Sequence, residues 1–401
     1  MPVLDPSTLH ARNAVAAVFA LNGFAFASWV SRIPDARATL GLSPGDLGVL
    51  LLALSLGAVV SLPTAGAWVH RFGAARVVRA AAVVAAVGLA VTGFGAGALG
   101  TVPLAALGLL LQGVGSGTWD VAMNVEGAAV EQRAGRTIMP RFHAAFSLGT
   151  VVGAATGAVL AWAELPVGWH LGAAAVLVAA GPAVAVRRFL PADTEHGSGR
   201  RPSPWRAWQE PRTLALGVLV LALALTEGVA NDWLAVALVD GYAVPTWVGA
   251  AGFALFVAAM TSGRLGGGAL LDHFGRLPVL WTSMAVAAAG VLLVVLGGSP
   301  PLVAAGVVLW GLGASLGFPV GMTAAADDPR HAAARVSVVS TIGYTAFLAG
   351  PPVLGFLGDR VGVLNALLLV AVLLVPSALA VPSARPGRRT RTPARSPGSR
   401  P

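Results

Sequence analysis

Five ionisable side chains interrupt stretches of the sequence that are otherwise apolar. They are Asp120, Glu126, Glu227, Asp232 and Arg264. A charged side chain at the centre of a lipid bilayer costs about 2.5–3.5 kcal/mol on insertion scales. In a membrane such residues face water, pair with one another or lie near the lipid surface, so each one is a candidate for a functional site.

Two of these carboxylates stand four residues before an asparagine. Asp120 precedes Asn124, and Glu227 precedes Asn231. Residues four apart share one face of a helix, so each pair presents a carboxylate beside an amide. A carboxylate accepts hydrogen bonds and an amide both donates and accepts them, which suits a hydroxylated or amino-bearing solute. Burial disfavours the charged form of a carboxylate, so a role in proton coupling is chemically reasonable.

Structural roles are the alternative for the same charged residues. The acids could pair with Arg264 or with backbone groups and only hold helices together. Glu126 and Asp232 lie nearer the ends of their stretches, where water could solvate them, although both remain candidates for solute binding or proton coupling. Arg264 either anchors a gate or contacts an anionic solute.

Further polar and aromatic side chains are candidates for the same site. Asn22 could bind a polar group, and the ring of Trp119 could stack on a sugar or anchor a helix at the lipid surface. His143 could sense protons, because its ordinary pKa is about 6.5, or it could simply be solvated at a helix end. Gln112 and Tyr344 are single polar groups with the same two interpretations.

The composition indicates the elements that must position these residues. Of the 401 residues, 56% are hydrophobic and 11% are charged, whereas an ordinary soluble domain has about 25% charged residues. Stretches of about 20 apolar residues, long enough to cross a bilayer, occur twelve times. They lie at 12–31, 45–69, 75–96, 102–128, 141–163, 168–189, 212–235, 246–271, 277–297, 301–325, 335–357 and 362–382. We therefore expect an all-α membrane protein with twelve transmembrane helices, and we exclude a soluble enzyme.

Several kinds of chemistry have no residues to support them. The sequence contains no cysteine, which excludes a disulfide framework, thiol catalysis and cysteine-based zinc sites. It also contains no phosphate-binding glycine-rich loop, no serine–histidine–aspartate set and no cluster with metal-ligand spacing. We expect no catalytic residues, no metal and no cofactor.

The arginines predict the orientation in the membrane. Basic loops are retained on the cytoplasmic side, and all 26 basic residues are arginines. With the N-terminus inside, 22 of them lie on the cytoplasmic side, three lie opposite, and Arg264 lies within a stretch. Both termini are therefore expected in the cytoplasm of a bacterial cell, in a multi-pass inner-membrane protein. The positive charge follows the topology, so we expect no nucleic-acid partner.

The chain is expected to divide into two halves. Residues 191–211 are polar, charged and proline-rich, which is typical of a cytoplasmic linker between two six-helix bundles at 1–190 and 212–382. Residues 383–401 form a basic, proline-rich tail that we expect to be disordered.

Internal repetition supports this division. The frame from Gly66 to Gly73 recurs from Gly268 to Gly275, and the glycine pattern of 111–117 recurs at 309–315. Their glycines suit close helix packing.

The repeated loops resemble the cytoplasmic signature of the major facilitator superfamily, Gly-x-x-x-Asp-Arg-x-Gly-Arg-Arg. His70 stands where the signature has its aspartate, and Arg71 keeps its place. In the second copy Asp272 is present and His273 replaces the arginine. The resemblance implies two pseudo-symmetric bundles of six helices and a loop that latches helix ends. The gating candidates are Gly66, Arg71, Gly73, Arg264, Asp272, Gly275 and Arg276.

A narrower resemblance rests on four passages, which are WVSRIP at 29–34, WDVAMNVE at 119–126, RFHAAFSLG at 141–149 and EGVANDW at 227–233. They resemble the YbjJ-like putative inner-membrane transporters of bacteria and, more distantly, the fucose-permease-like sugar/proton symporters. In that larger group the fourth span carries an acid and, four residues later, an asparagine, which Asp120 and Asn124 match. The group also tends to carry an acid near the end of span one, and none occurs between Asn22 and Arg32.

These observations favour a secondary active transporter that works by alternating access. We expect proton-coupled import of a small polar solute by a monomer in the lipid bilayer. Export of drug-like or natural-product compounds by proton antiport is an alternative, and a non-transporting membrane sensor or assembly protein is another.

Overall fold

The structure is a computed structural model that describes residues 5–135, 138–190, 204–328 and 331–385. Throughout these ranges the regular elements are helices. The first half contains α1 Pro6–Val30, α2 Ile33–Leu40, α3 Pro44–Phe72, α4 Ala74–Phe94, α5 Val102–Ala134, α6 Met139–Trp162 and α7 Val167–Ala185. The second contains α8 Pro211–Tyr242, α9 Thr246–Phe274, α10 Arg276–Leu296, α11 Pro300–Ala314, α12 Gly317–Ala325, α13 Ala332–Val361, α14 Val363–Ala366 and α15 Leu368–Ser377. Short turns of helix follow α4 (η1, Gly95–Leu99), α7 (η2, Val186–Arg188) and α15 (η4, Ala378–Ala384), and η3, Pro204–Gln209, precedes α8.

Twelve helical segments of the described ranges are long and apolar enough to cross a membrane, which confirms the expected number. Several extend beyond the apolar stretch that predicted them. The fourth continues to Ala134 and the seventh to Tyr242, because polar residues such as Glu131 and Asp240 continue a helix after its apolar part ends. The sequence did not indicate the separate short helix α2.

The repeated glycine frame marks two equivalent helix junctions. Gly73 separates α3 from α4, and Gly275 separates α9 from α10. Their φ angles are 81° and 77°, a backbone conformation that glycine adopts without steric cost. In both junctions the glycine N–H donates to the carbonyl four residues earlier, at Val69 and Leu271.

The same pseudo-symmetry extends into the packing. A Cβ atom placed on Gly115 would lie 2.4 Å from the backbone nitrogen of Ala85, and one on Gly313 would lie 2.4 Å from that of Ala287. These glycines therefore let α5 approach α4, and α11 approach α10, as closely as backbones can. The two halves repeat one arrangement of helices, as the sequence repeats indicated.

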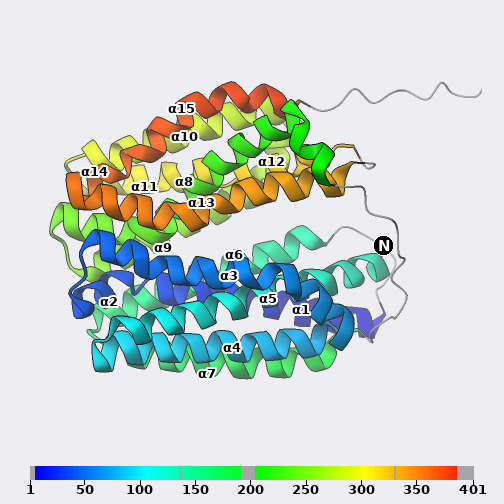
Figure 1. The fold of residues 1–401 in the computed structure, drawn as a ribbon, viewed down its shortest axis with the longest axis horizontal. Helices are drawn as coiled ribbons and strands as arrows, with labels where there is room; N and C mark the ends of the chain where they lie inside the picture. Colours follow the sequence, from blue (N-terminus) through cyan, green and yellow to red (C-terminus); the bar gives the residue numbers. More distant parts are fainter. Residues whose placement is uncertain (1–4, 136–137, 191–203, 329–330, 386–401) are drawn as a thin grey trace, which may run out of the picture.

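The helices form two bundles side by side (Figure 1). In the first, α5 packs against α3 and α4, and α1 against α6. In the second, α8 packs against α13, and α11 against α9 and α10. The predicted linker and tail lie outside the described residues over 191–203 and 386–401. The start of the tail is ordered, since Arg212 donates to the carbonyls of Ser383 and Arg385 at 3.0 and 2.9 Å.

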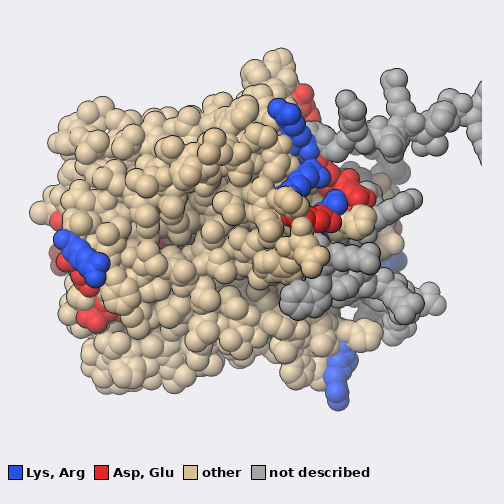
Figure 2. All heavy atoms as spheres, turned by 45° about the horizontal axis from the view of Figure 1, so that its top comes forward, with Lys and Arg blue, Asp and Glu red and all other residues tan. Residues whose placement is uncertain are grey.

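Charged residues gather at two opposite ends of one face of the molecule. Figure 2 shows arginines and acids gathered at both ends of the face it presents and uncharged residues between them. We call one end the linker end, where Phe72, Leu190, Pro211 and Phe274 lie. We call the other the α2 end, where α2 and Tyr242 lie. A band without charge between polar ends is the surface that a bilayer requires.

The bundles meet closely at the α2 end. Arg37 of α2 forms an ion pair with Asp240 at the end of α8. The Gly45 N–H donates to Asp359 at 3.1 Å. Near the middle of the same two helices, the Ser55 hydroxyl donates to the Phe347 carbonyl at 2.8 Å. Each of these three contacts joins one bundle to the other.

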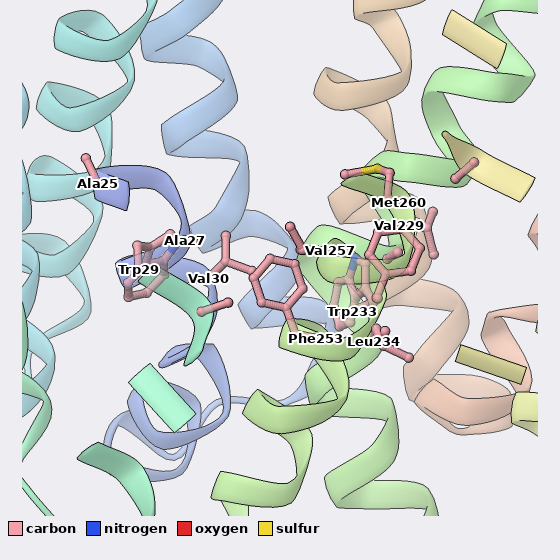
Figure 3. Close-up of a cluster of buried hydrophobic side chains, with 14 of the residues drawn as sticks. Ala25, Ala27, Trp29, Val30, Val229, Trp233, Leu234, Phe253, Val257 and Met260 are labelled. Carbon is pink, nitrogen blue, oxygen red and sulfur yellow. The ribbon is translucent and has the colours of Figure 1, made fainter. Parts of the chain in front are cut away.

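Apolar packing adds to these contacts between the bundles. Figure 3 shows a buried cluster that draws Trp29 and Val30 from α1, Trp233 from α8, and Phe253 and Val257 from α9. The core therefore runs from one bundle into the other without a break.

The ion pairs at the linker end of the described residues do not cross between the bundles. Asp327 binds Arg276 at 2.7 Å and Arg212 at 3.2 Å, and Glu210 binds Arg335 at 2.6 Å. All five residues belong to the second bundle. Among the described residues, no ion pair joins the bundles at this end. The interface is thus closed at the α2 end and unlatched at the linker end.

Candidate functional site

Asp120 lies near the middle of the membrane-spanning helix α5, 18 residues after its start. The Asn124 amide donates to the Asp120 carbonyl at 2.8 Å and to a carboxylate oxygen, Oδ1, at 3.3 Å. The predicted carboxylate–amide pair therefore forms, with both groups on one face of the helix. Both residues are half-buried.

Tyr344 of α13 faces Asp120 from the other bundle. The phenol lies within electrostatic range of the carboxylate, and 38% of the tyrosine surface is exposed. A phenol both donates and accepts hydrogen bonds. Asp120 and Tyr344 thus offer an acceptor and a donor on opposite sides of one interface.

Glu227 lies at the corresponding depth of α8, and Arg264 of α9 neutralises it. The guanidinium nitrogen Nη2 lies 2.9 Å from both carboxylate oxygens. The Arg264 Nε atom also lies 3.4 Å from the Ser315 carbonyl. Charged side chains inside a membrane characteristically pair with one another. The structural alternative for Glu227, an ion pair with Arg264, is therefore present in the molecule.

His143 brings the first bundle to this ion pair. It lies in the second turn of α6, is exposed, and is within electrostatic range of Arg264. The interface thus gathers Asp120, Asn124 and His143 from one bundle, and Glu227, Arg264 and Tyr344 from the other.

Asn231 and Asp232 follow Glu227 on α8 without joining this set. Asn231 is buried and Asp232 half-buried. Neither side chain makes a hydrogen bond or ion pair with another described residue. A role for either in solute binding stays a prediction.

Three other predicted residues lie inside the first bundle. Glu126 is buried and accepts the Leu190 N–H at 2.7 Å, so it caps the chain where this bundle ends. The amide of Asn22 lies 3.8 Å from the Met123 sulfur, between α1 and α5. Trp119 is fully buried in the core. All three side chains take part in the packing of the first bundle, and their role in solute binding stays a prediction.

The predicted gating residues divide into two groups. Arg276 latches the start of α10 to Asp327, as described above. Arg71 lies with its guanidinium carbon 5.5 Å from the centre of the Phe72 ring. Gly66 and Asp272 are exposed, and Asp272 forms no ion pair with another described residue. The loop of the second bundle is therefore latched through its arginine rather than through Asp272.

Sequence reasoning missed the ion pairs that hold helix ends together. Asp327 forms ion pairs with two arginines, and Arg37 forms one with Asp240 of the other bundle. No sequence motif surrounds Asp327, Arg37 or Asp240. The one available signal was the position of Arg37 and Asp240 on the same predicted side of the membrane. Within the described ranges, no three metal-ligating side chains gather at one point.

Comparison with known proteins identifies the family. The model of the Major Facilitator Superfamily matches residues 15–267 and 246–400. The uncharacterized transporter y4wD of Sinorhizobium fredii is 36% identical over 350 residues, 86% of this chain and 90% of that protein. An uncharacterized MFS-type transporter of Yersinia pestis is 31% identical over 358 residues, 89% of this chain and 91% of that protein.

Solved structures agree on the fold. A variant of the nucleoside transporter NupG superposes with a TM-score of 0.78 at 14% identity, over 94% of this chain and 100% of that one. The E. coli fucose:proton symporter superposes with a TM-score of 0.62 at 15% identity, over 94% and 99%.

The chain belongs to the major facilitator superfamily. It is a multi-pass membrane transporter of that type and not an enzyme.

Proposed function

We propose that the chain imports a small polar solute together with protons, and that Asp120 is the residue at which the two are coupled. The position of Asp120 carries this proposal. Its carboxylate lies within electrostatic range of Tyr344 of the other bundle, and its one described side-chain hydrogen bond comes from its own helix. A carboxylate has about four lone-pair sites, so most of them are available to a solute.

The contrast with Glu227 supports this choice. Arg264 neutralises Glu227, whereas the charge on Asp120 has no cationic partner in the described part of the chain. A proton, or a donor group on the solute, would satisfy that charge. We assign proton and solute binding to Asp120. We assign a structural role to Glu227 and Arg264, which join α8 to α9 beside the site.

The solute is proposed to carry several hydroxyl or amino groups. Asp120, Asn124 and Tyr344 together supply acceptors and donors but no large apolar surface. NupG and the fucose:proton symporter, which share this fold, are described as transporters of a nucleoside and of fucose, and both solutes carry hydroxyl groups.

The conformation fits the release step of an importer. An ion pair and the hydrogen bond from Gly45 to Asp359 join the bundles at the α2 end, and the arginine distribution favours a cytoplasmic linker end. On this assignment, which gives both termini to the cytoplasm, the molecule is closed to the outside and unlatched toward the inside. The two bundles, joined by the linker at residues 191–211, would rock about Asp120 in the bacterial inner membrane, with a monomer as the working unit.

Proton flux in proteoliposomes tests the proposal. The purified protein is reconstituted with a pH-sensitive dye inside the vesicles, and sugars, amino compounds and small acids are added outside. We expect acidification that follows one polyhydroxylated or amino-bearing solute down its gradient. Asp120→Asn should abolish this coupled flux, while Glu164→Gln, which changes an exposed carboxylate outside the site, should leave it intact.

Other outcomes would redirect the proposal. Alkalinisation driven by a solute would indicate exchange and favour the exporter. If folded protein gives no change in the pH inside the vesicles with any solute of the panel, the result would contradict proton-coupled transport of these solutes. Normal flux with unchanged pH dependence in Asp120→Asn would show that coupling occurs elsewhere.

A further inference from the structure

A groove of about 380 Å³ lies between α3, α4 and α5 near the linker end. Its volume falls in the range of about 300–1,000 Å³ that small-molecule sites occupy. Trp68 and Phe72 form one wall, Val77 and Val114 lie among the apolar lining, and Arg76 and Thr118 are its polar members. The groove is separate from the site around Asp120.

Glycines of α5 explain why the groove exists. A Cβ atom on Gly113 would lie 2.0 Å from the Leu54 carbonyl of α3, and one on Gly115 would lie 2.4 Å from the Ala85 nitrogen of α4. Both neighbours are therefore drawn tightly onto α5, but α3 and α4 pack little against each other. A wedge remains between them, with α5 as its floor.

The groove opens toward lipid. Its α4 wall belongs to a helix whose main packing partners are α5 and α7 of the same bundle. Trp68 and Phe72 are 49% and 40% exposed, and their rings stack with centroids 5.6 Å apart. Tryptophan at the end of a span is typical of the level of the lipid headgroups.

A cation stands at the mouth of this apolar groove. Arg76 is exposed in the first turn of α4, and it forms no ion pair with any described residue. Arg71 lies beside Phe72 at the same end. Basic pockets between transmembrane helices bind the headgroups of anionic lipids, and an apolar groove below such a cation matches an acyl chain.

We propose that the groove holds one acyl chain of an anionic phospholipid from the surrounding membrane, with the lipid phosphate on Arg76. The lipid would wedge α3 apart from α4. This site is independent of the solute and of the direction of transport.

The absence of cysteine allows a direct test. A single Ala80→Cys substitution places one thiol on the groove lining, and bimane labels it. The labelled protein is reconstituted in phosphatidylcholine vesicles that contain increasing fractions of brominated phosphatidylglycerol or brominated phosphatidylcholine, whose bromine quenches the fluorophore on contact. We expect half-maximal quenching at about a fivefold lower fraction of phosphatidylglycerol, since one basic residue at a membrane surface contributes attraction of that order.

Two substitutions decide the role of Arg76. Arg76→Gln should remove the preference for phosphatidylglycerol. Arg79→Gln changes an exposed arginine of the same helix that does not line the groove, and it should keep the preference within about twofold. Equal quenching by both lipids in the unsubstituted background would refute the site. If both variants lose the preference for phosphatidylglycerol equally, the preference arises from the general surface charge, and this result would also overturn the proposal.

Discussion

Arg37 of α2 and Asp240 of α8 form an ion pair across the two bundles. Both residues lie at the α2 end, where the hydrogen bond from the Gly45 N–H to Asp359 also crosses the interface. Arg37 further donates to the Leu42 carbonyl at 3.0 Å, so its own helix and loop hold it in place. The pair thus ties a rigid part of the first bundle to the second.

Removing this pair should favour opening at the α2 end. Ion pairs that remain partly exposed contribute about 0.2–1 kcal/mol, so Arg37→Ala should raise the open population by up to about fivefold. A single Val30→Cys in the buried cluster reports opening through its rate of reaction with a membrane-impermeant maleimide. We expect that rate to rise in Arg37→Ala.

The charge swap Arg37→Asp with Asp240→Arg should restore slow labelling of Cys at position 30. Arg360→Ala, an exposed arginine at the same end without a described ion pair, is the matched control. Fast labelling in the swapped protein would show that the pair does not hold the bundles together.

Breaking the pair between Glu227 and Arg264 should destabilise the second bundle. Arg264→Ala leaves a carboxylate inside the membrane without its cation. We expect a loss of about 2–3 kcal/mol in the free energy of unfolding, less than for a fully buried pair, because 17–26% of these side chains stays exposed. Thermal unfolding in detergent measures this loss.

The double variant Glu227→Gln with Arg264→Gln should recover part of that stability, because it removes both charges together. If the double variant is as unstable as the sum of its single variants, the two side chains do not interact energetically.

Pseudo-symmetric glycines should be equally sensitive to substitution. Gly115→Ala and Gly313→Ala each place a Cβ atom 2.4 Å from a backbone nitrogen, which forces helices apart. We expect each variant to lose about 1–3 kcal/mol of stability. Gly266→Ala meets open space on the surface of α9 and should be neutral or stabilising by up to about 1 kcal/mol. Melting temperatures in one detergent compare the three, and a loss confined to one half would contradict equivalent packing.

Glu210 predicts a pH dependence at the linker end. The hydrogen bond and charge of Arg335 hold the pKa of Glu210 below its usual value of 4.5. Stability from this contact is therefore complete above the unfolded pKa and is lost as the pH falls through the lower folded pKa. Glu210→Gln should unfold at a lower temperature than the parent at neutral pH, and the difference should shrink in acid below pH 4.5. A difference that grows in acid would contradict the assignment.

Much of the fold follows from the sequence. The length of the apolar stretches determines the number of spans, and glycine repeats in 66–73 and 268–275 indicate two equivalent halves. These signals are local, so they survive without tertiary information. Helix ends were harder to place, because α5 and α8 continue past their apolar parts to Ala134 and Tyr242.

The site could be predicted only in part. The spacing of Asp120 and Asn124 along one helix determines their hydrogen bond, so the sequence predicts it. Whether Glu227 pairs with Arg264 depends on how α8 and α9 are rotated about their axes, and no local pattern encodes that rotation. For the same reason Glu126 was grouped with Asp120, although the fold directs it to the Leu190 N–H.

The uneven distribution of contacts between the bundles has a practical consequence. Without solute, purified protein should present the surfaces around Asp120 to one face only. Antibody fragments selected against it will then be enriched for binders that enter from the linker face and act as wedges. Such a bound fragment would stop transport without occupying the α2 end. It would also serve as a fiducial marker for imaging this small protein.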